Sequence, residues 1–263
     1  MNQSLKRIIV MAVWICILIL GYYGWQHTPD GWLGKLHAIG YSVCHQIPSH
    51  GFYIGNSSFP LCARCTGLYL GALIGLVILI PSGRKSGIPS RPVIVLMLLF
   101  IIAWLVDGAN AFFSDLLNQV ILYPPTNTLR LLTGFGMGFS VAITLSTLIN
   151  YTVWQIQDRH PFLTNAYPLL GMIAIAIVLI FLISTQNEIL MTIFAYLSIG
   201  SIVLLLCLLH TIIWIILLHK ENTYRQWKDL LIVSSAGFLS AVIQITLLDI
   251  LRFTLTGTWE AFI

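Results

Sequence analysis

Three cysteines and two histidines lie close together in a sequence that is otherwise mostly hydrocarbon. Cys44 and His45 are adjacent, and Cys62 and Cys65 follow as a C-x-x-C pair. Cysteine sulfur and histidine nitrogen are donors that zinc prefers, and four of them complete a tetrahedral site. The sequence therefore predicts a metal site at these four residues, with zinc favoured over copper.

Either His45 or His50 can supply the fourth ligand of this site. A histidine next to a cysteine can share its metal ion only where the backbone bends strongly. Gln46 and Arg64 lie beside the donors and could orient them or neutralise thiolate charge. Turn-forming residues between the cysteines let the chain double back: Pro48, Gly51, Gly55 and Pro60.

Two further interpretations of the cysteines compete with a metal site. In the main alternative, Cys62 and Cys65 exchange a disulfide with Cys44 and pass electrons to a membrane quinone, since a helix start favours a reactive thiolate. In the other, a structural disulfide joins the loop to the next helix and no metal is bound. Three cysteines are an odd number, so a disulfide leaves one thiol free. Cys16 and Cys207 fall within apolar segments and are expected to pack as small apolar side chains.

The composition indicates a membrane as the surroundings of the fold. Of 263 residues, 58% are hydrophobic and 8% charged, and the mean hydropathy is +0.90; soluble domains have about 25% charged residues. A bilayer core about 30 Å thick needs about 20 apolar residues per helix. We therefore predict an all-α, polytopic transmembrane helical bundle in the cell membrane, one domain over residues 1–263. Its seven predicted spans are 8–25, 62–80, 93–113, 131–154, 166–183, 189–218 and 230–251.

The basic residues between these spans predict the orientation, because cytoplasmic loops carry an excess of Lys and Arg. Nine lie on one side: Lys6, Arg7, Arg84, Lys85, Arg91, Arg159, Lys220, Arg225 and Lys228. Four lie on the other: Lys35, Arg64, Arg130 and Arg252. The N-terminus is therefore predicted to be cytoplasmic and the C-terminus outside, with the cluster on the extracytoplasmic side, partly in an external loop at 27–61. The basic residues form no patch with interleaved aromatics, so no nucleic-acid binding is expected.

Polar residues within the spans suggest a pocket near the cluster. Asp107 falls in the third span, where a carboxylate is costly and normally faces a partner. Arg130 begins the fourth span at a similar level, and we predict that the two form an ion pair and are the catalytic candidates. Asp249 and Gln244 come to the same level on the seventh span, which predicts one outer-leaflet polar pocket.

This pocket leaves the activity open. With one open metal position, a metal-bound water near Asp107 could support hydrolysis or group transfer on a lipid-level substrate. If the ion pair only joins helices, no enzyme is implied. A small-solute transporter is the third hypothesis.

A stripe of glycines marks the second span as a packing face. Gly67, Gly71 and Gly75 repeat every four residues, which lets a neighbouring helix approach closely. The neighbour can belong to the same chain or to a second copy, so a homo-oligomer through this face is a further expectation.

At the cysteines the chain resembles a known family. C-H-Q at 44–46 and P-L-C-A-R-C-T-G-L-Y-L-G at 60–71 resemble the signature of an uncharacterised family of polytopic prokaryotic membrane proteins, domain of unknown function 2085. The likeness continues through Asp107-Gly108, Leu129-Arg130 and Thr133-Gly134 and covers roughly residues 35–140. The resemblance implies that these positions matter, but the family carries no established reaction.

Overall fold

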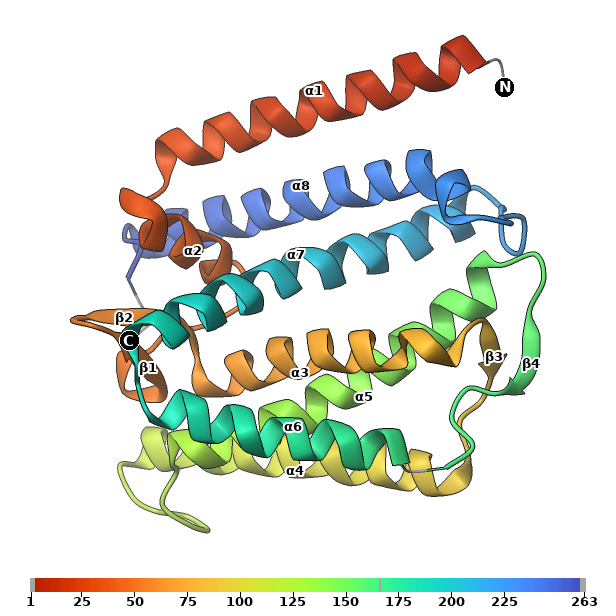
Figure 1. Cartoon of the computed structure of the whole chain (residues 1–263). Coiled ribbons are helices and arrows are strands. Elements are labelled where there is room, and N and C mark those ends of the chain that lie inside the picture. The colour runs from red at the N-terminus through yellow and green to blue at the C-terminus, as the bar shows by residue number, and fades with distance from the viewer. Residues whose placement is uncertain (1–2, 166, 261–263) are drawn as a thin grey trace.

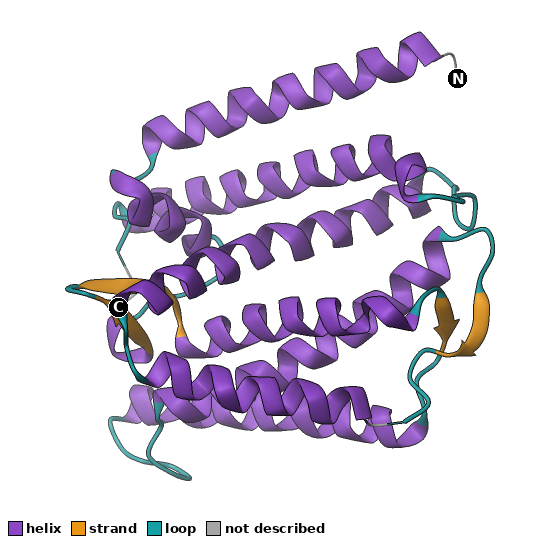
Figure 2. Ribbon diagram, viewed as in Figure 1, coloured by secondary structure: helices purple, strands orange, loops and turns teal. Residues whose placement is uncertain are grey.

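Long apolar helices make up most of the molecule. The computed structural model describes residues 3–165 and 167–260. In that part of the chain, seven helices are long and apolar enough to cross a membrane, and they lie side by side with their axes roughly aligned (Figures 1 and 2). They are α1 (Gln3–His27), α3 (Ala63–Leu79), α4 (Arg91–Leu117), α5 (Asn127–Val153), α6 (Tyr167–Ser184), α7 (Glu188–Leu217) and α8 (Leu231–Thr256).

The helices confirm the predicted fold class and the number of spans. Most helix ends lie within a few residues of the predicted ends, because the hydropathy of each segment decides which residues can face lipid. Ala166, the predicted start of the fifth span, lies outside the described residues.

The segment between α1 and α3 is more structured than the predicted loop. It contains the short helix α2 (Gly31–Tyr41), a 3-10 turn η1 (Pro48–His50) and an antiparallel hairpin of β1 (Gly51–Ile54) and β2 (Ser57–Cys62). Gly55 makes the hairpin turn with a positive φ of 57°. The close approach of α2 to β2 requires Gly40, since a Cβ there would lie 2.4 Å from the Pro60 carbonyl oxygen. We call this end of the bundle the hairpin end.

Helices α3 and α5 form the closest helix pair of the bundle. A Cβ added to Gly67 of α3 would lie 2.2 Å from the Leu131 carbonyl oxygen, and one added to Gly138 of α5 would lie 2.2 Å from the Leu68 carbonyl oxygen. Glycines on both helices therefore let the two backbones touch. The predicted packing face of α3 is filled by α5 of the same chain, so a second copy would have to bind elsewhere.

Helix α1 lies at the edge of the bundle and packs against α8 (Figure 1). The Trp14 and Phe238 rings are 5.9 Å apart. Among the described residues, no atom lies within 4 Å of a Cβ added to Gly21 or Gly24. The packing of α1 therefore leaves open space along this face.

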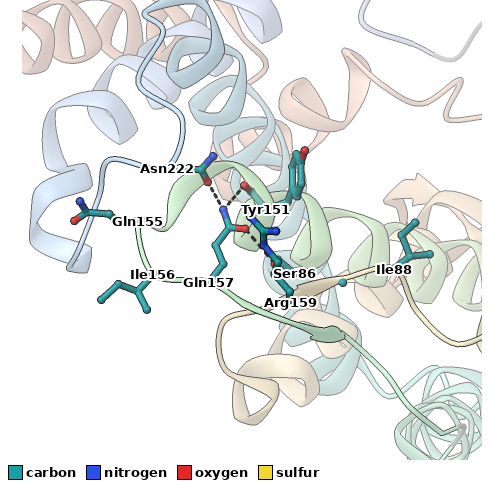
Figure 3. A pocket seen from close by; sticks show the side chains of 9 residues that line it. Ser86, Ile88, Tyr151, Gln155, Ile156, Gln157, Arg159 and Asn222 are labelled. Carbon is teal, nitrogen blue, oxygen red and sulfur yellow. Dashed lines mark hydrogen bonds between the residues drawn. The ribbon is translucent and has the colours of Figure 1, made fainter.

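The opposite end of the bundle carries the parallel strand pair β3 (Lys85–Gly87) and β4 (Asp158–Pro161) and the short turns η2 (Ile80–Ser82) and η3 (Trp227–Leu230). A hollow of about 830 Å³ lies beside the strands (Figure 3). Its polar groups bond to one another: the Gln157 side chain donates to the Tyr151 backbone carbonyl oxygen at 2.8 Å and to the Asn222 side chain. Helix α1 begins at this end and α8 finishes at the hairpin end, as an odd number of spans requires.

Candidate metal centre

Three of the four predicted ligands, from two separate segments, converge at the hairpin end. Cys44, His45 and Cys62 each offer a donor atom, and these atoms all lie within 4.8 Å of one another. Cys65 lies outside this group of three, one turn into α3, and its backbone N–H donates to the Cys62 sulfur at 3.5 Å. Two ligands at about 2.3 Å from a tetrahedral zinc lie about 3.8 Å apart, so the donors need to close by about 1 Å to hold one ion. The prediction that the chain doubles back to bring Cys44 beside Cys62 is confirmed.

A residue in the left-handed backbone conformation makes the bend that the adjacent Cys44 and His45 need in order to share one ion. Gln46 has a φ of 56°, so the chain reverses directly after His45. The buried Gln46 amide donates to the carbonyl oxygens of His37 at 2.9 Å and Pro60 at 2.8 Å. Gln46 thus ties the ligand segment to both α2 and β2, which is the orienting role that the sequence predicted for it.

Cys62 stands at the N-terminus of α3, where backbone N–H groups favour negative charge. It is the N-cap residue, and its sulfur accepts a hydrogen bond from the Cys65 N–H at 3.5 Å. Hydrogen bonds from the Cys44 and Cys65 thiols lower the pKa of Cys62 well below its usual range. The same bond to Cys62 is the main reason that the pKa of Cys44 is raised to about 12. Cys62 is therefore the favoured thiolate, the form in which cysteine binds metals.

The two candidate histidines take different places. His45 belongs to the group of converging donors, and its Nδ1 accepts a hydrogen bond from the Ile47 N–H at 3.0 Å. Metal ligation by His45 would exchange this contact for a metal bond. The His50 ring lies 5.4 Å from the His45 ring, and its Nε2 is 3.2 Å from an Asp115 carboxylate oxygen. Burial, and then the charge of Arg130, lowers the pKa of His50.

Arg252, which was not predicted to lie at the site, hydrogen-bonds the backbone of the ligand segment. Arg252 of α8 donates to the carbonyl oxygens of Tyr41 at 2.6 Å, Cys44 at 2.5 Å and His45 at 3.2 Å. Its guanidinium carbon lies 3.7 Å from the centre of the Tyr41 ring. More than 200 residues separate it from Cys44 along the chain. The sequence feature that could have indicated this role is that Arg252 is one of only four basic residues predicted at this end.

The predicted ion pair between Asp107 and Arg130 is wrong, because Arg64 is the partner. Arg64 donates to Asp107 Oδ2 from Nη2 at 2.5 Å and from Nε at 3.0 Å. The hydroxyls of Tyr123 and Thr133 lie 3.3 Å from Oδ1 and Oδ2. Arg64 sits in the first turn of α3, close enough for its long side chain to reach α4. Arg130 donates instead to the Asn127 side chain at 3.0 Å.

The residues predicted to share one polar pocket do not all lie together. Asp107 contacts residues of α3 and α5 and of the segment after α4, whereas Asp249 lines hollows between α1 and α8. Arg130 is buried, and the charges of Arg64, Asp115 and Asp107 act on it more strongly than that of Cys62. Equal depth in the membrane therefore does not bring Asp249 to the site of Asp107, because the two lie on different faces of the bundle.

The fold and the cluster define a class: a polytopic integral membrane protein with a cysteine and histidine cluster at one end of its helices. A sequence model of the family described as "Predicted membrane protein (DUF2085)" matches residues 44–144. An uncharacterized protein of Methanothermobacter thermautotrophicus is 32% identical over 108 residues, 40% of this chain and 86% of that protein. The chain belongs to this family.

A second relative is longer than the matched region. The uncharacterized protein MJ1492 of Methanocaldococcus jannaschii is 34% identical over 109 residues, 40% of this chain and 63% of that protein. No solved structure matches the chain. The matched region contains the four predicted metal ligands, but not Arg252.

Proposed function

We propose that this protein is a membrane zinc protein in which Cys44, Cys62, Cys65 and His45 hold one zinc ion. The observation that supports this most is the convergence of donors from two segments within 4.8 Å. Three sulfurs and one imidazole nitrogen are a common donor set of structural zinc sites. Copper is the less favoured metal for this set.

The burial of the cluster favours a closed site. Cys44 and Cys62 are only 5% and 3% exposed. With four protein ligands, the ion would fix the hairpin and α2 to the N-terminus of α3. The hairpin end would then be a zinc-stabilised cap on the bundle, on the predicted extracytoplasmic side.

Asp107 and Arg130 would support this site rather than perform chemistry. The Asp107 carboxylate is occupied by Arg64, Tyr123 and Thr133, so it has little freedom to act as a general base. Three thiolates on Zn²⁺ carry a net charge of −1, which the buried Arg130 would balance, since its charge acts on Cys62. A metalloenzyme acting on a lipid-level substrate would require one of the four ligands to leave.

Thiol-disulfide exchange is the second candidate, because the Cys62 N–H donates to the Cys44 sulfur and the Cys62 sulfur accepts from the Cys65 N–H. The structure describes all five cysteines, and each is a free thiol. Exchange with a partner protein needs an accessible sulfur, and the burial of Cys44 and Cys62 works against it. Oxidation by a membrane quinone would also require access to these buried sulfurs.

Metal stoichiometry combined with thiol counting separates the two candidates. The full chain, purified in detergent, is expected to contain one zinc per chain, with only Cys16 and Cys207 reacting with a thiol reagent. Replacement of Cys44, Cys62 or Cys65 by serine removes the zinc, since each supplies a thiolate. Cys16→Ser is the matched control and keeps the zinc.

Histidine variants identify the fourth ligand. His45→Gln is expected to lower zinc occupancy more than His50→Gln does, because only His45 lies in the converging group. Metal-free protein with a reducible disulfide among the three cluster cysteines would contradict the zinc site and support thiol exchange.

A further inference from the structure

A buried carboxylate with one oxygen that no described residue hydrogen-bonds lies on the far side of α8 from the Asp107 network. Asp249 is only 8% exposed. Its Oδ1 is buried and has no hydrogen-bond partner among the residues that the structure describes. An unsatisfied carboxylate at membrane depth is costly and normally faces a partner or a ligand. The described residues therefore leave one oxygen of Asp249 available to a ligand.

Two adjoining hollows between α1 and α8 meet at this residue. Their volumes are about 390 Å³ and about 290 Å³, and Asp249 lines both. The larger is walled by four rings: Tyr23, His27, Phe253 and Trp259. The Tyr23 and His27 rings stack at 4.1 Å, and the Phe253 and Trp259 rings lie 5.3 Å apart. A carboxylate together with aromatic walls is the environment that favours an organic cation.

The smaller hollow continues deeper along the membrane and is mostly apolar, with Lys35 and Asp249 among its lining residues. Its walls include Leu20, Val203, Phe238, Val242 and Ile245. Gly21 and Gly24 of α1 also line it, and no described atom outside α1 lies within 4 Å of a Cβ added at either. A molecule with a cationic head and an apolar tail would match the two hollows together.

The two basic side chains nearby are directed at backbone carbonyls. Lys35 donates to the carbonyl oxygens of Trp25 at 2.5 Å and Thr28 at 3.0 Å. Arg252, one turn along α8 from Asp249, donates to the carbonyl oxygens of Tyr41, Cys44 and His45. The charge of Arg252 acts on Asp249, but neither basic side chain donates a hydrogen bond to Asp249 Oδ1 among the described residues.

We propose that Asp249 and the surrounding rings bind the ammonium group of an amphiphilic molecule. The ammonium lies against the Asp249 carboxylate and the faces of Phe253 and Trp259, and the apolar tail occupies the deeper hollow. This site is separate from the metal cluster and does not depend on the zinc proposal. The ammonium can come from a lipid headgroup or from a free amine.

Native mass spectrometry of the full chain in detergent tests the site and distinguishes these sources. Phosphatidylethanolamine is expected to bind at least tenfold more tightly than phosphatidylglycerol with the same tails, because only the former carries an ammonium. If the source is a free amine, tetramethylammonium binds saturably by calorimetry and the two lipids bind alike. Both results support an ammonium site.

Matched variants decide whether Asp249 carries the binding. Asp249→Asn keeps the side-chain shape but removes the charge, and is expected to weaken ammonium binding at least tenfold. Glu260→Gln makes the same charge change at an exposed position of the same end and leaves binding unchanged. Trp259→Leu should weaken binding severalfold and serves as a second test if Asp249→Asn lowers the yield of folded protein.

Two results overturn the proposal. One is that wild-type protein shows neither a preference for phosphatidylethanolamine nor saturable binding of tetramethylammonium. The other is that folded Asp249→Asn, with an unchanged melting temperature, binds the ammonium probe as tightly as wild type.

Discussion

At the scale of single residues, the cluster depends on side chains that hold backbone carbonyls in place. Gln46 and Arg252 together bond the carbonyl oxygens of His37, Tyr41, Cys44, His45 and Pro60. Such outer contacts orient ligands and commonly change metal affinity about 10–100-fold when removed. The geometry of the donors therefore depends on residues that bind no metal.

Arg252→Gln tests this support. The variant loses up to three charge-assisted hydrogen bonds to the ligand segment, so zinc affinity is expected to fall about 10–100-fold. Competition with a chelator measures the affinity. Arg91→Gln, at an exposed position at the other end, should leave it unchanged, and an equal loss in both variants would contradict a specific role for Arg252.

The ion pair between Arg64 and Asp107 predicts a second mutational pattern. Asp107→Asn leaves the Arg64 guanidinium without its buried counter-charge, which costs about 3–5 kcal/mol. The double variant Arg64→Met with Asp107→Leu should be more stable than Asp107→Asn alone, because both charges are gone. Thermal unfolding in detergent measures both, with the exposed Asp30→Asn as control. If Asp107→Asn is harmless, the pair does not stabilise the fold.

Residue types and spacing were sufficient to predict the cluster, but not the partner of Asp107. Cys44, His45, Cys62 and Cys65 are chemically distinct from the apolar chain around them. Arg64 and Arg130 are the same residue type at a similar depth, and only the packing of α3 between its neighbours decides which one reaches α4. For the same reason, Asp249 was assigned to the wrong face of the bundle.

At the scale of helices and strands, the glycine contact between α3 and α5 positions the first turn of α3. Hydropathy was sufficient to predict the seven spans, because lipid selects for apolar length. It did not predict α2 or the hairpin β1–β2, because α2 has only 11 residues and the strands four and six, too few to establish a clear period. The glycines of α5 that match those of α3 were also not recognised.

Gly138→Ala tests the helix contact. The added Cβ would lie 2.2 Å from the Leu68 carbonyl oxygen, a backbone atom that cannot move alone. We expect a loss of about 1–3 kcal/mol from overpacking. Gly200→Ala on α7 has no atom within 4 Å of the new Cβ among the described residues and should change stability by less than about 0.5 kcal/mol. Equal melting temperatures of the two variants would contradict the close α3–α5 contact.

At the scale of the whole molecule, the cluster occupies one end of a seven-helix bundle. Nine basic residues are assigned to the opposite end and four to the hairpin end, so the hairpin end is predicted to face outside. The side on which the cluster lies determines whether its thiols meet an oxidising compartment. A bound metal would protect them there.

Reporter fusions test the orientation. Alkaline phosphatase joined to the C-terminus is expected to be active, because that enzyme folds only outside the cytoplasm. A green fluorescent protein joined to the N-terminus should fluoresce. The reverse pattern would place the cluster in the cytoplasm and make oxidation a weaker concern for its thiols.

The central claim is that one zinc ion joins the hairpin to the start of α3. Zinc K-edge X-ray absorption of the purified full chain tests it most directly. The account predicts three sulfur neighbours at about 2.3 Å and one nitrogen neighbour at about 2.0–2.1 Å. A spectrum with only nitrogen and oxygen neighbours, or protein that holds no zinc while its cluster thiols form a disulfide, would contradict it.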